Sequence, residues 1–282
     1  MSSLKVISFL VSFKYFFVSL FTGSPGIVSE NSSWKLDSIG KFTPILYESS
    51  GLLVEDSLLY THRDSGFETL LFICNLEGKI IDTLSFNGLK TQDWEDITRD
   101  DNNDLYLGDL GNNQNSRQDL TIYKVDYLGN SESIAVSYAN QKMFPPSRKK
   151  WKNFDSEGLV YFQDSLLLFS KNRGIKWVKV YKVPAKKGNY SLLPTDSIYL
   201  HHPVTGAAIS PDKRELALLA YGKIYFFPIE GKIILYNKGY SKKFIRSGQA
   251  EGIAWVDEKT IVISNERGIL YYLSKSDKNT PD

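Results

Sequence analysis

The residues of this sequence best suited to do chemistry are glutamates that recur at one place in a repeated pattern. Glu95, Glu157 and Glu251 each precede a short apolar run. Carboxylates contributed by several segments can surround a hard cation such as Ca²⁺. An ion held in this way can act as a Lewis acid toward a phosphoester or a lactone, with a carboxylate as general base. Whether these glutamates meet depends on the elements that carry them.

Those elements come in five similar units, spaced about 45 residues apart except for one longer interval of about 62. The units begin at Ser50-Gly51-Leu52, Glu95-Asp96-Ile97, Glu157-Gly158-Leu159, Thr205-Gly206-Ala207 and Glu251-Gly252-Ile253. A second apolar run follows in each unit, and then a third that carries an aliphatic–aromatic pair. These pairs are Leu71-Phe72, Ile122-Tyr123, Val180-Tyr181, Ile224-Tyr225 and Leu270-Tyr271. Fourth runs lie at residues 79–85, 133–137 and 197–200, with a weaker one at 242–245.

Four short strands in a unit of about 45 residues predict a blade of a β-propeller, so the expected fold class is all-β. Five units predict a single ring of five blades. Six blades are the alternative, if the longer interval hides strands around residues 143–151. The fifth unit ends after its third strand. We therefore expect an N-terminal strand, at residues 34–39 or 42–47, to complete that blade and close the ring.

In such a ring the first strand of each blade lies nearest the axis. Its start meets the end of the second strand at one mouth of the central channel, so polar residues scattered along the chain are expected to gather there. The candidates for binding a ligand or metal ion are Glu95, Asp96, Asp109, Asp155, Glu157, Glu251, Glu266, Asp64 and Asn172. The candidates for binding an anion are Arg117, Arg63 and Lys171. Ca²⁺ is the candidate cofactor.

The same residues have a structural interpretation, which the sequence leaves open. A carboxylate at the start of an inner strand can accept backbone N–H groups of the next blade, and neighbouring arginines such as Arg173 and Arg267 can pair with it. The Asn- and Gly-rich segment 108–117 also has two interpretations. Its composition suits turns with positive φ, or it recognises a ligand at the mouth, with Arg117 binding an anion.

Charge and cysteine content exclude several classes of protein. The 282 residues include 34 Lys and Arg against 32 Asp and Glu. This balance excludes a disordered chain and gives no basis for binding nucleic acid through bulk charge. Cys74 is the single cysteine, so an intramolecular disulfide and a cysteine-based zinc cluster are excluded.

The first residues are typical of an export segment. A basic start at Lys5 is followed by an apolar stretch, which Lys14 interrupts, and then by small residues at 22–26. We expect residues 1–26 to form a signal peptide or an uncleaved anchor, residues 27–276 the propeller, and residues 277–282 a disordered tail. The expected location is periplasmic, on the cell surface or secreted. We expect a monomer that meets a membrane only through the N-terminal segment.

Several motifs, taken in order, resemble a known group of proteins. They are Asp93-Trp94-Glu95-Asp96-Ile97, Gly108-Asp109-Leu110-Gly111-Asn112-Asn113, Asp155-Ser156-Glu157-Gly158-Leu159, Val204-Thr205-Gly206-Ala207 and Ser210-Pro211-Asp212. This order resembles uncharacterised exported β-propeller proteins of the Bacteroidetes type. The resemblance implies a propeller fold and an exported setting, and it implies no reaction. The architecture is more distantly similar to calcium-dependent propeller phytases and gluconolactonase-like propellers, whose metal ligands do not map onto this sequence.

The function we expect is binding of a small ligand or a divalent cation at the acidic mouth of the channel. Metal-dependent hydrolysis of phosphoesters or lactones would extend that function. The alternative is a non-catalytic scaffold of the cell envelope that binds a protein or a glycan through its rim loops. The sequence leaves open whether the protein is an enzyme, because propellers serve many unrelated functions.

Overall fold

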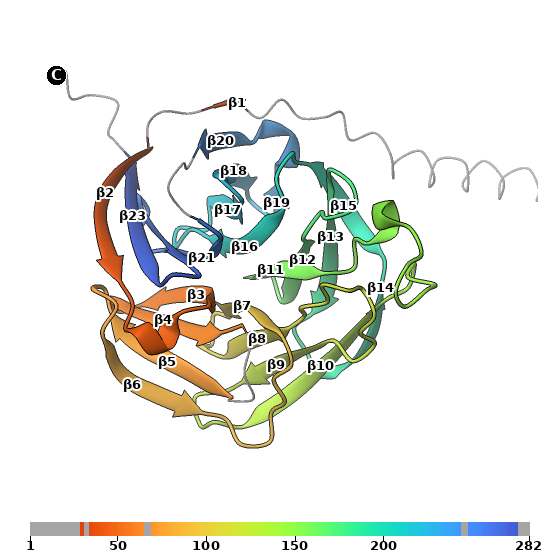
Figure 1. The fold of residues 1–282 in the computed structure, drawn as a ribbon, viewed down its shortest axis with the longest axis horizontal. Coiled ribbons are helices and arrows are strands. Elements are labelled where there is room, and N and C mark those ends of the chain that lie inside the picture. Colours follow the sequence, from red (N-terminus) through yellow and green to blue (C-terminus); the bar gives the residue numbers. More distant parts are fainter. Residues whose placement is uncertain (1–28, 31–33, 65–68, 244–247, 276–282) are drawn as a thin grey trace, which may run out of the picture.

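Short apolar runs separated by turns form the strands of this chain, as their composition predicts. The structure is a computed structural model that describes residues 29–30, 34–64, 69–243 and 248–275. Its strands form five sheets arranged around a central axis, and the four main strands of each sheet pair antiparallel (Figure 1). The predicted all-β, five-bladed propeller is therefore confirmed.

The first two blades follow the expected strand order. Blade 1 contains β3 (Ser49–Glu55), β4 (Leu58–Arg63), β5 (Leu70–Asn75) and β6 (Ile80–Ser85). Blade 2 contains β7 (Trp94–Arg99), β8 (Leu105–Asp109), β9 (Thr121–Val125) and β10 (Ser131–Tyr138). A fifth strand, β14 (Gly188–Leu192), pairs in parallel with the outer edge of β10. The turn between β9 and β10 passes through Gly129 at φ 83°, a left-handed conformation that glycine adopts without strain.

The remaining blades complete the ring. Blade 3 contains β11 (Ser156–Phe162), β12 (Ser165–Ser170), β13 (Trp177–Pro184) and β15 (Pro194–Tyr199). Blade 4 contains β16 (Val204–Ile209), β17 (Glu215–Ala220), β18 (Lys223–Glu230) and β20 (Tyr240–Lys243), with β19 (Ile233–Ile234) on β18. Blade 5 contains β21 (Ala250–Trp255), β22 (Thr260–Asn265), β23 (Ile269–Lys275) and β2 (Trp34–Lys41).

Blade 5 shows how the chain closes the ring. The N-terminal strand β2 lies antiparallel to β23, with Trp34 opposite Lys275 and Gly40 opposite Leu270. Of the two segments that could have closed the ring, residues 34–39 therefore do so. Residues 42–47 instead contain a short 3₁₀ turn, η1 (Pro44–Leu46). The two-residue strand β1 (Ser29–Glu30) adds in parallel to β20 at the edge of blade 4.

The long interval between the second and third units contains no additional blade. Around residues 143–151 it holds one 3₁₀ turn, η2 (Lys149–Trp151), within a loop that leaves the ring between β10 and β11. A third such turn, η3 (Tyr236–Lys238), precedes β20. The six-bladed alternative is wrong, because the extra residues of this interval form a loop.

Apolar side chains fill the spaces between neighbouring blades. Among the described residues they form five groups, one at each interface between blades. Each group contains the aromatic residue of one third strand, and these residues are Phe72, Tyr123, Tyr181, Tyr225 and Tyr271. The recurring aromatic therefore packs a blade against its predecessor, and burial of its large apolar surface stabilises the ring.

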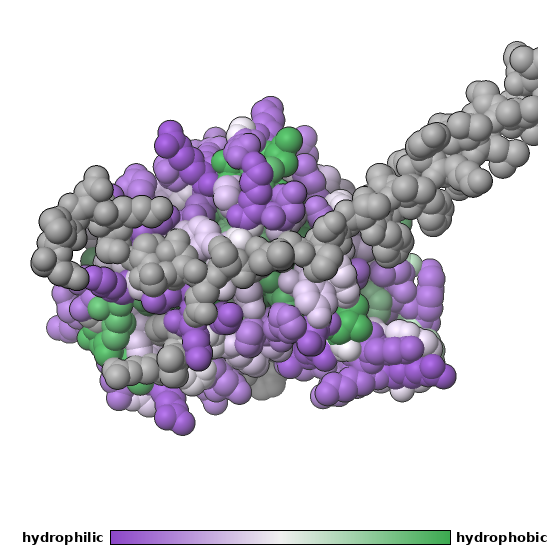
Figure 2. All heavy atoms as spheres, turned by 90° about the horizontal axis from the view of Figure 1, so that it is seen from above, coloured by the Kyte–Doolittle hydropathy of each residue, from purple (hydrophilic) through white to green (hydrophobic). Residues whose placement is uncertain are grey.

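On the face of the molecule that Figure 2 shows, hydrophilic residues predominate and the hydrophobic patches are small and separate. None of the helices in the described part of the chain is long and apolar enough to cross a membrane. The predicted signal or anchor at residues 1–26 and the predicted tail at 277–282 lie outside the described residues.

Candidate functional site

The five inner strands share an irregularity that positions the recurring glutamates. Each of β3, β7, β11, β16 and β21 contains a register shift near its start, where one residue is left without a partner on the second strand. The skipped residues are Gly51, Glu95, Glu157, Thr205 and Glu251. A β-bulge redirects a side chain out of the regular alternation. Three of the five bulges therefore present a glutamate near the axis.

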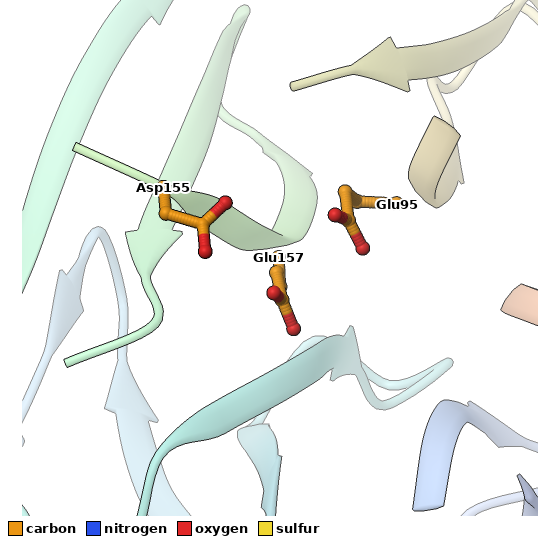
Figure 3. Close-up of side chains that lie close together, drawn as sticks. All are labelled: Glu95, Asp155 and Glu157. Atoms are coloured by element: carbon orange, nitrogen blue, oxygen red, sulfur yellow. The ribbon is translucent and has the colours of Figure 1, made fainter. Parts of the chain in front are cut away.

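Two of these glutamates meet a third carboxylate at the centre. Oxygen atoms of Glu95, Asp155 and Glu157 lie within 4.8 Å of one another, and the three side chains point toward one another (Figure 3). We call these three residues the acidic triad. Glu95 is 7% exposed, Glu157 2% and Asp155 0%. The triad is thus enclosed by protein, where charge–charge interactions are stronger than in water.

Two cations accompany two members of the triad. Arg173 donates from Nε to Oδ2 of Asp155 at 2.6 Å and from an Nη atom to Oε1 of Glu157 at 3.0 Å. Lys171 forms an ion pair with Oε2 of Glu157. The other oxygen of Asp155 accepts the backbone N–H of Asn112 at 2.7 Å. Asp155 and Glu157 are therefore well supplied with donors.

Glu95 differs from its two neighbours. Within the described part of the chain, no hydrogen bond donor or ion-pair partner reaches its carboxylate. Burial raises the pKa of Glu95 well above its ordinary value, and the nearby Glu157, Asp93 and Asp155 raise it further. The triad therefore holds more negative charge than its cations neutralise, so it favours binding either protons or a cation.

Asp93 extends this excess of negative charge. Burial and the charge of Asp155 raise the pKa of Asp93 to about 6. Its carboxyl group lies against Gly111, where an added Cβ would be 2.1 Å from Cγ of Asp93 and 2.4 Å from Oε1 of Glu95. Only a residue without a side chain fits there, so Gly111 lets the two carboxyl groups approach this loop.

Glu251 stands at the outer side of the same cluster. Its carboxylate accepts a hydrogen bond from the Tyr221 hydroxyl at 3.4 Å, and the Lys171 ammonium lies 5.2 Å from the centre of the Tyr221 ring. Burial raises the pKa of Glu251 to about 7, against the opposing effect of Lys171. A carboxyl group that titrates near neutral pH can serve as a general acid or base.

The segment 108–117 is held by its own polar side chains. Arg117 donates to Oδ1 of Asp109 at 3.0 Å and to the Gly111 carbonyl at 2.8 Å. Asn112 donates to the Phe154 carbonyl at 2.8 Å and accepts the backbone N–H of Arg117 at 2.9 Å. The predicted anion-binding residue Arg117 thus pairs with Asp109, and its binding of an external anion stays a prediction.

Asp96 and Asn172 connect blades rather than joining the triad. Asp96 is buried and accepts backbone N–H groups from Ile97 at 2.9 Å, Leu159 at 2.8 Å and Ala207 at 3.2 Å. Asn172 donates to the Leu200 carbonyl at 3.0 Å and accepts the N–H of Val204 at 3.2 Å. These contacts match the structural interpretation of polar residues at the inner strands.

The other three candidates lie toward the edge of the mouth. Arg63 is 4.0 Å from the Glu48 carboxylate, and Glu266 accepts a hydrogen bond from the Gln249 side chain. Asp64 and Glu266 are near enough to raise the pKa of Glu251. They contribute negative potential to the mouth without entering the triad.

Three residues of the site were not selected as candidates from the sequence. Asp93 lies just before the inner strand β7, whereas Arg173 and Tyr221 follow the second strands β12 and β17. For Asp93, its position relative to the bulge is the signal that could have found it. A residue two positions before a bulged glutamate, as Asp93 is to Glu95 and Asp155 is to Glu157, lies beside it at the mouth.

The oxygen spacing in the triad is compatible with a bound cation. Ca²⁺ takes oxygen ligands at about 2.3–2.6 Å, so two ligands on opposite sides of the ion are about 4.8 Å apart. The three carboxylates fall within that span. Each oxygen of Asp155 and Glu157 retains a second lone pair beside its hydrogen bond donor. The buried acidic triad could therefore hold a metal ion.

Fold and site together define a five-bladed β-propeller with a buried acidic triad at its centre. No family model matches the chain, and no curated protein matches it. Its fold is similar to that of a virginiamycin B lyase from Staphylococcus aureus, with a TM-score of 0.43 and 15% identity over 81% of this chain. That match covers 66% of the lyase, just under two thirds of its length.

Two further solved structures are similar at the same distant level. A gluconolactonase from Xanthomonas campestris has a TM-score of 0.48 and 13% identity, with 90% of this chain and 88% of that chain covered. The WD40 domain of Pan2 from Neurospora crassa has a TM-score of 0.44 and 8% identity, with 89% of this chain and 98% of that chain covered. These similarities concern the overall propeller arrangement.

Proposed function

We propose that the protein binds a divalent cation, Ca²⁺, through Glu95, Asp155 and Glu157. The observation that carries the proposal is the Glu95 carboxylate, which is buried among other carboxyl groups. No hydrogen bond donor or ion-pair partner contacts it in the described residues, although the charge of Lys171 is near enough to lower its pKa. An uncompensated buried charge is costly. A divalent ion would compensate it and would connect blades 2 and 3 through their inner strands.

The cation would support hydrolysis of an ester, either a phosphoester or a lactone. A bound divalent ion polarises the ester oxygen as a Lewis acid and supplies charge stabilisation to the transition state. Asp155 and Glu157 are nearly inaccessible, which suits ligands of the ion. Glu251 is only partly buried and has a pKa of about 7, which suits proton transfer at neutral pH.

Cation binding is tested by thermal unfolding of the chelator-treated full chain at pH 8, with and without Ca²⁺. A ligand at 100 times its Kd stabilises a protein by about 2.7 kcal/mol, which is roughly 5–10 °C for a chain of this size. We expect Glu95→Gln to abolish the increase in Tm. The matched control is Glu266→Gln, at the edge of the mouth, which should retain it. An unchanged Tm of the wild-type protein in millimolar Ca²⁺ contradicts the proposal.

Hydrolysis is tested separately, with a chromogenic phosphomonoester and a lactone as substrates in the presence of Ca²⁺. We expect turnover of one of them, a loss of kcat in Glu251→Gln, and an unchanged increase in Tm on Ca²⁺ addition in that variant. If neither substrate is hydrolysed while Ca²⁺ still raises the Tm, the enzymatic part of the proposal fails and the cation site stands.

We also propose that the chain is exported, on the strength of the basic and apolar pattern of residues 1–26. Expression in a bacterial host with cell fractionation tests this, and N-terminal sequencing distinguishes a cleaved signal from a retained anchor. Recovery of the uncleaved protein in the cytosol contradicts it.

A further inference from the structure

A cavity lies under the loop that leaves the ring between β10 and β11. This pocket of about 450 Å³ is enclosed by residues of the loop on one side and of β13 on the other. Met143 and Trp151 come from the loop, Phe154 from the segment that enters β11, and Tyr181 from β13. None of the triad residues lines it. Its volume is in the range of small-molecule sites, about 300–1,000 Å³.

The walls of this pocket are mainly apolar and aromatic. Met143 and Trp151 are each nearly half exposed. The loop reaches the ring again at Phe154, which is buried against Tyr138 at a ring separation of 5.5 Å. The loop therefore holds two large apolar side chains over an open pocket instead of using them to close it.

All charged side chains that line the pocket are lysines: Lys142, Lys150 and Lys179. Lys142 donates to the Ala139 carbonyl at 2.8 Å, and the Lys150 ammonium lies 5.9 Å from the centre of the Trp151 ring. The guanidinium of Arg148 lies 5.0 Å from the same ring. The pocket is thus positively charged at its edge.

Among these lysines, Lys179 gives the clearest indication of a bound anion. It is half-buried on β13 between two buried residues, and burial lowers its pKa. In the described ranges no carboxylate pairs with its ammonium group. A half-buried ammonium without an anion carries a desolvation penalty that an anionic ligand would offset.

Tyr181 adds a second observation at the base of the pocket. Its side chain is 0% exposed, and its hydroxyl has no hydrogen bond partner in the described part of the chain. A buried polar group without a partner costs about 1–3 kcal/mol. An unpaired hydroxyl and an unpaired ammonium, two residues apart on one strand and both lining an aromatic cavity, are polar groups that a ligand could satisfy.

We propose that this pocket binds a small aromatic carboxylate. The aromatic body lies against the apolar walls at Trp151, Met143 and Phe154, and the carboxylate pairs with Lys179. A charged hydrogen bond in a partly buried site is stronger than one between neutral groups. Specificity then follows from charge, because a neutral analogue leaves the Lys179 ammonium unpaired, whereas a cation is repelled by the lysines.

Isothermal titration calorimetry of the full chain with 2-naphthoate tests this proposal, with 2-naphthamide as the neutral analogue of the same shape. We expect the carboxylate to bind at least tenfold more tightly than the amide. The substitution Lys179→Met should remove that difference by weakening the carboxylate at least tenfold and leaving the amide unchanged. The matched control is Lys182→Met, an exposed lysine on the same strand, which should behave as the wild-type protein.

Equal affinities for the carboxylate and the amide in the wild-type protein overturn the proposal, and this comparison requires no variant. No measurable binding of 2-naphthoate at millimolar concentration overturns it as well. If Lys179→Met binds the carboxylate as tightly as the wild-type protein does, the assignment of Lys179 is overturned. Loss of affinity in Trp151→Ala for both ligands alike supports the placement of the aromatic body.

Discussion

Replacing Glu251 with Gln is expected to remove the part of the pH dependence of stability that Glu251 contributes in the cation-free protein. Burial raises the pKa of Glu251 from 4.5 to about 7, and the charges of Glu266 and Asp64 contribute in the same direction. The folded state therefore binds this proton more tightly than the unfolded chain does. The resulting stabilisation is fully present below about pH 4.5 and is lost as the pH rises through 7.

The magnitude follows from the shift in pKa. At 1.36 kcal/mol per unit, a shift from 4.5 to about 7 corresponds to on the order of 3 kcal/mol. A chain of this size changes Tm by about 2–4 °C per kcal/mol. Ionisation of Glu251 should thus lower the wild-type Tm by roughly 6–12 °C between pH 5 and pH 8, in addition to the decrease from Asp93, whose pKa is also raised. Glutamine keeps the acceptor for the Tyr221 hydroxyl and cannot ionise, so the variant should lose the contribution of Glu251 and keep that of Asp93.

The assay is thermal unfolding after treatment with a chelator, at half-unit steps from pH 5 to pH 8.5. Glu258→Gln is the matched control, because Glu258 lies in the exposed turn between β21 and β22 of the same blade. That variant should follow the wild-type curve. A wild-type Tm that does not fall over this range, or that falls equally in Glu251→Gln, refutes the electrostatic account of the mouth.

Three further substitutions test how the site is built. Asp96→Ala leaves three buried backbone N–H groups without an acceptor. The substitution should therefore lower the free energy of unfolding by about 2–4 kcal/mol, measured by urea titration. A decrease below about 1 kcal/mol contradicts the role of Asp96 in joining blades. Gly111→Ala places a methyl group in the space of the Asp93 and Glu95 carboxyls, so it should abolish the Ca²⁺-dependent increase in Tm, and retention of the full increase contradicts the geometry. Arg173→Met removes a cation from the triad, so it should lower the Tm of the cation-free protein at pH 8. The triad then holds more net negative charge, so Ca²⁺ binding should strengthen severalfold by calorimetry; weaker binding contradicts this electrostatic expectation.

The propeller could be predicted from the sequence because the pattern that defines each blade lies within a short stretch of chain. The alternation of apolar residues, the turns and the recurring third-strand aromatic lie within units of about 45 residues. Closure of the ring could not be decided, because residues 34–39 and 42–47 both carry apolar residues that become buried, as Trp34 and Phe42 are. The parallel pairing of β14 with β10 was missed because its partners are about 50 residues apart along the chain.

The candidate site was predictable in part for a related reason. Glu95, Glu157 and Glu251 recur at one place in the repeat, so the sequence indicated which residues were special. It did not indicate that each of them lies at a β-bulge. The adjacent Asp96 looked equivalent in sequence, but it faces the backbone of the next blades. In a bulged strand, the face on which a residue lies depends on where the register shifts. That position is determined by pairing with the second strand, which the sequence pattern does not show.

A crystal structure of the full chain grown at pH 8 in millimolar CaCl₂ tests the central claim most directly. We predict a single cation between Glu95, Asp155 and Glu157, with oxygen distances of about 2.3–2.6 Å. At this pH the neighbouring Asp93 and Glu251, with pKa values of about 6 and about 7, are mainly ionised, which favours cation binding. A well-ordered mouth with no ion at the triad, and with Glu95 still lacking any cation, would contradict the account.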